Sequence, residues 1–429
     1  MERTRFVAAL SCLLIFYFSS YSQSIYSFQG IGSLNHQGMP NNFMMGEVGI
    51  GTPTIWHINT QNPAFLVYNN FSSFQTGLEL DFRRFTTQES SSRDETGGLR
   101  YLGYAFPIIR GKWSSSFGIL PYTDVNYNTF SERSVEGASN DVFQIIDDRG
   151  EGGLTNFFWA NGFRVKDFSF GFRAQFTFGA IEKESQLFAF RREIVEDINA
   201  VLDTVEVQLG NPITSDVQES YADVNILFGA GYKIDLSKTG RLNFGVTYSP
   251  STPLRGSEEV LLQRRDNNGT QIQSQEVSSS SLDFSLPTTF GLGISYQKLN
   301  VLAFGVDYER QLWSSSTVGN QTLQDFFKLS AGGNWTPDYD DISSYFERVR
   351  YSLGFNYQRQ PYIIQDESLT EFGINFGASF PVSSFSSLDL GFKWGQLGQV
   401  GNGLVRENYF KVVLGATIND QWFIKRRYD

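Results

Sequence analysis

The strongest constraint on this chain is a strict two-residue alternation between Asp167 and Ala180. Aromatic residues and one alanine occupy the even positions 168–178, and small or polar residues such as Gly171 and Arg173 occupy the odd ones. Successive side chains of a β-strand point to opposite sides, so this segment has one aromatic face and one polar face. A soluble sandwich rarely gathers five Phe on one face of one strand. The pattern is typical of a wall with lipid outside and water or a ligand inside.

The alternation recurs to the end of the chain and predicts an all-β fold, a transmembrane antiparallel β-barrel of about fourteen strands. The predicted strands are Ser72 to Phe85, Leu99 to Pro107, Trp113 to Tyr122, Leu154 to Val165, Phe168 to Ala180, Tyr221 to Ile234, Arg241 to Tyr248, Thr288 to Tyr296, Val301 to Tyr308, Asp325 to Trp335, Val349 to Tyr357, Glu371 to Phe380, Leu388 to Trp394 and Asn408 to Ile418. Two long polar stretches, Glu182 to Ser220 and Arg255 to Ser281, are predicted to be loops. Within the first, Ile194 to Val207 fits either a short helix or a disordered loop.

The composition agrees with a barrel whose apolar outer face and polar inner face together give an intermediate mean hydropathy. Aromatic residues make up 16% of the 429 residues, yet the mean hydropathy is only -0.26. The formal net charge of -11 makes nucleic acid an unsuitable partner, because phosphate binding requires a basic surface. Outer-membrane lipid and lipopolysaccharide are the expected surroundings.

The N-terminus has the features of a secretory signal. Arg3 and Arg5 precede an apolar run from Phe6 to Phe18, which predicts a cleaved signal peptide over residues 1–22 and export to the outer membrane. A lipoprotein signal acylated at Cys12 is the alternative, but Cys12 lies inside the apolar run and not at its end. Cleavage leaves a mature chain without cysteine, so disulfides and thiolate metal sites are excluded.

The following segment, residues 23–70, shows little alternation and is rich in Gly, Asn and Met. We predict that it folds inside the barrel, which occupies residues 71–429, as a hatch or plug. Asn62-Pro63-Ala64 within it predicts a tight turn, because Pro63 lacks a backbone donor and biases Asn62 toward an extended conformation.

The sequence contains few candidates for catalytic residues. The two histidines, His36 and His57, lie outside the predicted strands, and no Ser/His/Asp grouping is visible. The acidic runs Asp147-Asp148 and Asp338 to Asp341 lack the spacing of a calcium loop. We therefore expect no catalytic residue, no cofactor and no metal site.

Leu286-Pro287 precedes the Gly-rich strand Thr288 to Tyr296, Asp307-Tyr308 and Trp313 follow in the next strand, Gly245 to Pro250 lies upstream, and Asn62-Pro63-Ala64 lies in the N-terminal segment. These short motifs resemble the long-chain fatty-acid transporter family of outer-membrane β-barrels, and Asn62-Pro63-Ala64 matches the Asn-Pro-Ala of the family's hatch. The C-terminal part, residues 408–427, resembles the ending of Bacteroidetes members of this group and differs from the proteobacterial transporters, whose chains usually stop on an aromatic residue.

This resemblance implies a passive channel for hydrophobic small molecules such as long-chain fatty acids. Family members take ligand into an apolar pocket above the hatch and release it through a gap in the wall. Phe43, Met44 and Met45 are the candidate ligand contacts, since Met adapts to varied apolar shapes, and Arg83 and Arg173 are candidates for a charged head group. The alternative for the three apolar residues is ordinary packing of the plug against the wall.

The resemblance also extends to accessory barrels and to the plug subunit of the type IX secretion translocon. The second hypothesis is therefore a barrel that docks on such a translocon or closes it and transports nothing itself. Its partners are secretion-translocon proteins, and the long acidic loops favour it.

Overall fold

The computed structural model describes residues 24–139, 141–196, 202–266, 270–316, 323–383 and 385–421. The predicted signal peptide, including Cys12, lies outside these residues. So do residues 422–427 of the C-terminal resemblance.

Fourteen antiparallel strands close into a barrel, as the alternation predicted. They are β2 (Ser72–Thr86), β3 (Ser91–Ile109), β4 (Trp113–Pro121), β6 (Val142–Val165), β7 (Phe168–Glu196), β9 (Ile213–Asp235), β10 (Gly240–Ser249), β13 (Thr289–Lys298), β14 (Leu302–Gln311), β15 (Phe326–Trp335), β16 (Arg350–Ile364), β17 (Glu367–Pro381), β18 (Ser387–Leu397) and β19 (Arg406–Asp420). The sheet closes where β19 pairs with β2, from Arg406 opposite Thr86 to Asp420 opposite Ser72. Every predicted strand corresponds to one barrel strand, so the predicted fold class is confirmed.

The two faces of each strand divide as the sequence indicated. On β7, Phe168 and Phe170 are each about half exposed, at 52% and 51%, whereas Arg173 is 5% exposed and Thr177 is fully buried. The aromatic exterior and polar interior are those of an outer-membrane barrel. None of the helices in the described ranges is long and apolar enough to cross a membrane.

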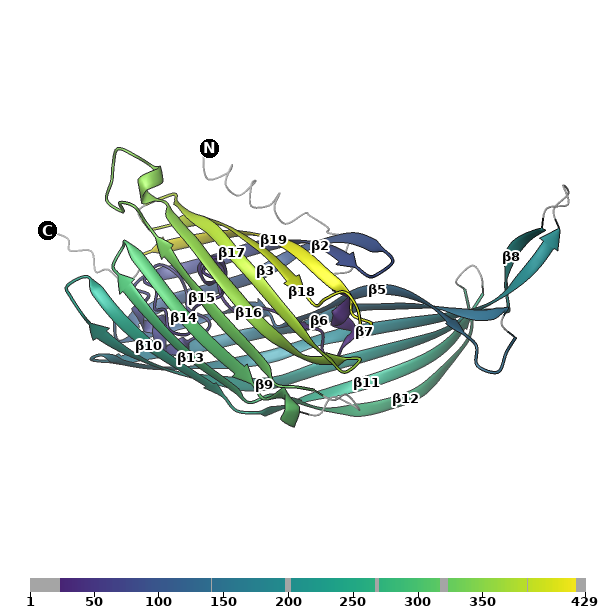
Figure 1. Ribbon diagram of the computed structural model, residues 1–429. Helices are drawn as coiled ribbons and strands as arrows, with labels where there is room; N and C mark the ends of the chain where they lie inside the picture. The colour runs from purple at the N-terminus through teal and green to yellow at the C-terminus, as the bar shows by residue number, and fades with distance from the viewer. Residues whose placement is uncertain are drawn as a thin grey trace, which may run out of the picture.

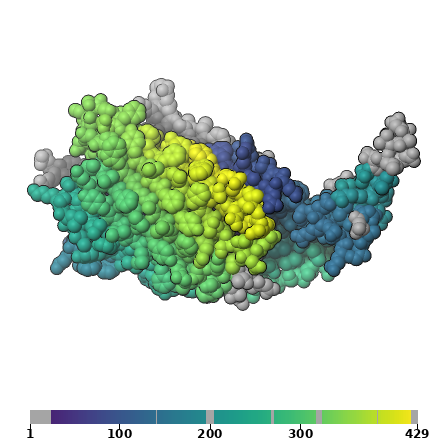
Figure 2. Space-filling view, in the orientation of Figure 1, coloured from purple at the N-terminus to yellow at the C-terminus, as the bar shows by residue number. Residues whose placement is uncertain are grey.

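Four further strands extend the wall beyond the barrel. They are β5 (Thr123–Ser134), β8 (Leu202–Gln208), β11 (Thr252–Arg265) and β12 (Gln271–Leu286). Together with the continuing ends of β6, β7 and β9 they form a projecting sheet at one end of the barrel (Figure 1). A cavity of about 960 Å³ lies between this sheet and the β2–β3 hairpin, where the surface is hollowed (Figure 2).

The projecting sheet corrects the prediction of two long loops. Most of the described residues of 182–220 and 255–281 are in strands, and the described parts of 194–207 belong to β7 and β8, which pair from Phe190–Gln208 to Glu196–Leu202. These strands lack the aromatic alternation because they do not face lipid on one side. Cross-strand ion pairs stabilise them instead, such as Lys183 with Glu219 at 2.7 Å.

The N-terminal segment, Ser24 to Phe71, lies in the barrel lumen. It contains η1 (Ile25–Phe28), β1 (Ser33–Leu34), α2 (Pro40–Met44) and η2 (Pro63–Tyr68). Inward-facing side chains from distant strands bind its backbone: Asn375 of β17 donates to the Phe43 carbonyl at 2.8 Å, and Arg173 of β7 donates to the Thr60 carbonyl. Contacts from both sides of the barrel hold this segment across the interior.

Inward-facing glycines let the segment lie directly on the wall. A Cβ at Gly354 of β16 would overlap the backbone of Met45 and Gly46, and one at Gly245 of β10 would overlap the Ile50 carbonyl. The small residues between the aromatic ones in the sequence are therefore required by backbone contact and not by the lumen's polarity alone.

Apolar residues close the barrel at the end where the projecting sheet begins. We call them the mouth cluster: Ile31, Val125, Tyr127, Leu154, Ile181, Tyr221, Leu254, Phe284, Leu286, Trp313, Leu323, Phe326 and Tyr362. They come from the N-terminal segment and from many strands, so they form a hydrophobic core at the mouth of the barrel. A second buried cluster, which includes Met39, Leu66 and Phe158, packs the same segment against the wall.

Gly354→Leu should displace the N-terminal segment without opening the barrel. Overpacking costs about 1–3 kcal/mol, so the segment should open roughly tenfold more often, and limited proteolysis of the detergent-folded protein should cut it correspondingly faster. The heat-dependent gel shift of the barrel should remain.

Gly98→Leu in β3 is the matched control, because no atom lies within 4 Å of a Cβ at Gly98. Equal cleavage rates in the two variants would contradict the close packing of the segment on the wall.

Candidate functional site

The barrel wall is interrupted between β3 and β5. The β3–β4 ladder runs from Ile109 opposite Trp113 to Leu102 opposite Ile119. Pro121, which ends β4, has no N–H to extend the ladder. Beyond this point the described part of β3 pairs with β2, and β5 pairs with β6 from Val125 opposite Gly152. We call this interruption the wall gap.

Local backbone geometry on β6 lets the neighbouring strand follow the change of direction. Gly152 and Gly153 have φ values of +112° and +140°, which other residues rarely adopt. A Cβ at Gly153 would overlap the Thr123 carbonyl. The Tyr122 N–H, between β4 and β5, donates to the Leu154 carbonyl at 2.7 Å. Proline on one strand and two glycines on its partner therefore bend the wall at the gap.

Two cavities meet at the wall gap. The first, about 410 Å³, is lined on the β3 side by Gly97, Gly98 and Leu99 and on the β5 side by Val125 and other residues. The second, about 200 Å³, lies between the N-terminal segment and the barrel wall, and we call it the lumen chamber. Arg100 of β3 and Asp124 of β5 line both cavities, so they stand at the boundary between chamber and gap.

A short part of the N-terminal segment bridges the two edges of the gap from inside. β1 pairs with β5 at Ser33–Asp124 and Leu34–Thr123. The Asn35 side chain donates to Asp124, and its oxygen accepts from Arg100 Nη1 at 3.1 Å. This bridge separates the chamber from the gap in the described structure.

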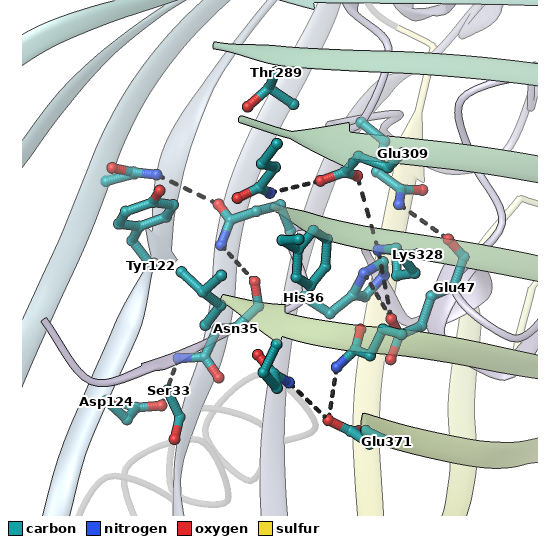
Figure 3. Close-up of a pocket in the computed structure, with 18 of the residues that line it drawn as sticks. Ser33, Asn35, His36, Glu47, Tyr122, Asp124, Thr289, Glu309, Lys328 and Glu371 are labelled. Atoms are coloured by element: carbon teal, nitrogen blue, oxygen red, sulfur yellow. Dashed lines mark hydrogen bonds and ion pairs between the residues drawn. The ribbon is translucent and has the colours of Figure 1, made fainter. Parts of the chain in front are cut away.

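Charged side chains form the floor of the lumen chamber (Figure 3). Glu47 of the N-terminal segment contacts Lys393 of β18 at 2.9 Å and Lys328 of β15 at 3.6 Å, and Lys393 also contacts Glu371 of β17 at 3.2 Å. Burial alone would raise the pKa of Glu47, but Lys393, followed by His36 and Lys328, holds it well below its usual range. Glu47 is therefore a charged anchor between segment and wall.

His36 also faces this floor, and its side chain is 4% exposed. Burial lowers its pKa well below the usual range, Glu47 opposes this, and Lys328, Arg100 and Lys393 add to it. Within the described residues neither ring nitrogen makes a hydrogen bond, the closest carboxylate oxygen being Glu47 Oε2 at 3.5 Å.

The N-terminal segment is also held by a single carboxylate on β14, the strand next to the one that carries Lys328. Asp307 of β14 accepts hydrogen bonds from the backbone N–H groups of Gly49 and Ile50, both at 2.6 Å, and of Gly51 at 3.1 Å. Hydrogen bonds to a charged acceptor are stronger than neutral ones. Asp307 is thus a specific anchor for the loop that follows α2.

Three of the predicted ligand residues line the chamber, namely Phe43, Arg83 and Arg173. Arg83 is already bound, at 2.6 Å from Glu407 and 2.9 Å from Asp81. Met44 and Met45 are fully buried and do not line the chamber. Met44 lies where a Cβ at Gly377 or Gly391 would meet it, and the Met45 sulfur is 3.0 Å from Asn334 Nδ2.

The predicted Asn-Pro-Ala turn lies deep in the lumen. Asn62 caps η2: its Oδ1 accepts from the Ala64 N–H at 3.1 Å, and Pro63 is the first residue of that helix. Asn62 Nδ2 donates to the Ile50 carbonyl at 2.8 Å, next to the loop that Asp307 holds. The motif therefore fixes the fold of the segment and does not line the chamber.

Sequence reasoning missed the charged floor. Glu47 is an isolated charge in an irregular segment, and only the folded chain places it near Lys328, Lys393 and Glu371. A signal existed for the strand residues, because Lys328 and Lys393 occupy inward positions of the alternation, between Phe327 and Leu329 and between Phe392 and Trp394.

Solved structures of proteins with low sequence identity to this chain share its fold. The Pseudomonas putida toluene transporter TodX has a TM-score of 0.59 at 13% identity, the Pseudomonas aeruginosa FadL homologue 0.56 at 13%, and the Ralstonia pickettii toluene transporter TbuX 0.55 at 14%. Each match covers 90% of this chain and 99% of the other. The resemblance drawn from the sequence is thus confirmed for the fold.

Comparison with curated proteins gives no significant match. The family model described as BamG matches residues 1–429, which is the full length of the sequence. The chain therefore belongs to the BamG family.

Proposed function

We propose that this protein is a passive outer-membrane channel that delivers hydrophobic small molecules through its wall. The observation that carries the proposal is the wall gap between β3 and β5, with the lumen chamber directly behind it. A closed barrel in lipid needs all its backbone groups paired, so an interruption at this point requires a function. Arg100 and Asp124, which line both cavities, mark the route between them.

The position of the gap suits lateral release. The part of β3 between the gap and the short turn at residues 110–112 extends from Arg100 to Ile109. A tilted transmembrane strand needs about 9–11 residues, so the gap opens near the outer edge of the hydrocarbon layer if the short turns face the periplasm. A solute that leaves here enters lipid without crossing the N-terminal segment, which occupies the lumen beyond the chamber.

The solved neighbours support the class of solute. Two are described as toluene transporters and one as a FadL homologue, and their fold is shared along most of this chain. We propose long-chain fatty acids among the substrates, with Phe43 and Arg173 in contact with ligand. The transport is passive and involves no catalysis, since diffusion along this route breaks no covalent bond.

Filling the gap should reduce transport. In Gly98→Trp the new ring has open space at the gap cavity, so it should obstruct exit without disturbing the fold. Uptake of a radiolabelled C12 to C18 fatty acid by cells expressing the variant should fall severalfold.

Gly98→Ala is the matched control and should transport as the natural chain does. Undiminished uptake in Gly98→Trp, with equal amounts of protein in the outer membrane, would refute lateral exit at this gap.

Asp307→Ala should loosen the N-terminal segment. Each hydrogen bond to a charged group is worth about 1.5–3 kcal/mol, and the variant loses three of them. Planar bilayer recordings should show larger or more frequent ion-conducting openings than the natural protein.

Asp223→Asn is the control, because Asp223 pairs with Arg255, whose side chain is 83% exposed, and lines neither the lumen chamber nor the gap cavity. Silent, indistinguishable recordings from all three proteins would show that the Asp307 anchor does not keep the lumen closed.

The projecting sheet favours a second candidate function, an accessory subunit that docks on another protein, such as a type IX secretion translocon. It extends far from the barrel and ends in β12, which pairs with β11 on one side (Figure 1). Exposed strand edges can pair with other chains. Deleting residues 255–281 should abolish stoichiometric co-purification of translocon proteins and leave fatty-acid uptake intact if this candidate is correct. Loss of fatty-acid uptake with retention of the co-purifying partners would exclude the accessory-subunit function.

A further inference from the structure

We propose that the substrate is an amphiphile whose head group carries an acidic group together with further hydrogen-bonding groups, and that this head occupies the lumen chamber. The inference rests on the proposed channel function and narrows its substrate class. A hydrocarbon such as toluene, or a solute whose head is a carboxylate alone, would leave buried polar atoms of the chamber without partners.

The chamber itself is amphipathic. Its roof includes Leu286, Phe326 and Tyr362 of the mouth cluster, with Leu34 and Tyr122 packed against it. Its floor is the charged group around Glu47, and Figure 3 shows Glu309, Lys328 and Glu371 gathered there. An apolar roof over a polar floor fits a molecule with one apolar and one polar part.

Side-chain amides form an unusually large part of the lining. Nine of them come from the N-terminal segment and from five strands: Asn35, Gln37, Gln61, Asn156, Gln175, Asn225, Gln311, Gln358 and Gln360. Each amide offers two donors and an acceptor oxygen. Each of the nine already makes at least one hydrogen bond within the described residues. The donors and acceptors that remain suit a head group with several hydrogen-bonding groups better than a purely apolar solute.

Buried polar atoms at the chamber lack partners within the described residues. They are both ring nitrogens of His36, the Oε1 atom of Gln61 and the Nε atom of Arg173. All three residues line the chamber. Buried polar atoms in folded proteins are almost always hydrogen-bonded, so unbonded ones at a cavity indicate a polar guest.

Arg173 specifies an acidic group on that guest. Five other cations line the chamber, and each has a carboxylate within 4.0 Å: Arg83, Arg100, Lys328, Lys393 and Lys411. Arg173 has none within that distance among the described carboxylates; Glu309 acts on it only from farther away, and its side chain donates to the Thr60 carbonyl and lies 6.0 Å from the Phe158 ring centroid. A buried guanidinium that no carboxylate contacts directly favours an anionic ligand.

The chamber is large enough for the head group of the ligand but not for the whole molecule. Its volume of about 200 Å³ is below the roughly 300–1,000 Å³ typical of complete small-ligand pockets. The gap cavity, about 410 Å³, begins at Arg100 and Asp124. The tail therefore extends from the chamber toward the gap once the Asn35 bridge opens.

Three probes with one C12 tail test the inference on the purified full-length protein in detergent. They are 1-dodecanol, dodecanoate and N-dodecanoylglycine, and calorimetry or tryptophan fluorescence gives their Kd values. N-dodecanoylglycine should bind about tenfold or more tightly than dodecanoate, because only its amide adds hydrogen bonds in the chamber. Equal Kd values for these two, or tightest binding of 1-dodecanol, would overturn the proposal.

The Arg173→Gln variant tests whether Arg173 contacts the acidic group of the ligand. It should bring the Kd of N-dodecanoylglycine to within severalfold of that of 1-dodecanol, while Arg255→Gln, 83% exposed on the outer surface, should change nothing. An unchanged ranking in folded Arg173→Gln would refute the role of Arg173. The ranking of the three probes on the natural chain decides the head-group proposal even if Arg173→Gln does not fold.

The outcomes separate this inference from the channel proposal. Equal affinities for all three probes, with uptake still blocked by Gly98→Trp, would remove the head-group preference and leave the channel. The predicted ranking, with uptake unaffected by Gly98→Trp, would keep the binding site and remove lateral exit.

Discussion

Backbone pairing is the constraint on which this structure depends. A wall in lipid must satisfy every N–H and C=O group within the sheet, and ladders such as β10–β13, β13–β14 and β14–β15 run without a register shift. The junction between β3 and the strand formed by β4 and β5 is different, because the β3–β4 ladder ends at Leu102 opposite Ile119, just before Pro121. The gap, the chamber behind it and the Asn35 bridge all lie at this one interruption. The arrangement gives a closed barrel a side exit without leaving a free edge along its whole height.

The same alternation that makes the wall also shapes the interior. Outward positions need large apolar side chains, whereas inward positions meet the N-terminal segment at backbone distance and accept only small ones, as at Gly354 and Gly245. Where the segment leaves room, the inward positions carry charges instead, and Lys328, Lys393 and Glu371 meet Glu47 there. The two-residue alternation therefore determines which side chains face lipid, which contact the N-terminal segment and which line the chamber.

The barrel strands were predictable because each one carries its own local signal, such as the Phe residues of β7. The projecting sheet was not, because strands such as β8 and β11 have no aromatic face and owe their structure to pairing with β7 and β9. Arg173 was recognised as inward-facing from the alternation alone. That no described carboxylate contacts it directly, and that Glu47 lies near Lys328 and Lys393, depend on contacts across hundreds of residues, which spacing along the chain cannot reveal.

The central claim is that ligand leaves the chamber through the wall gap. The most direct measurement is photolabelling of the protein in native outer membranes with a fatty acid carrying a diazirine in its tail, followed by mapping of the labelled peptides. The account predicts labels on β3 between Ser91 and Arg100 and on β5 between Thr123 and Phe130, together with the chamber. Labels confined to the opposite end of the barrel, in the short turns at residues 110–112 and 236–239, would contradict it.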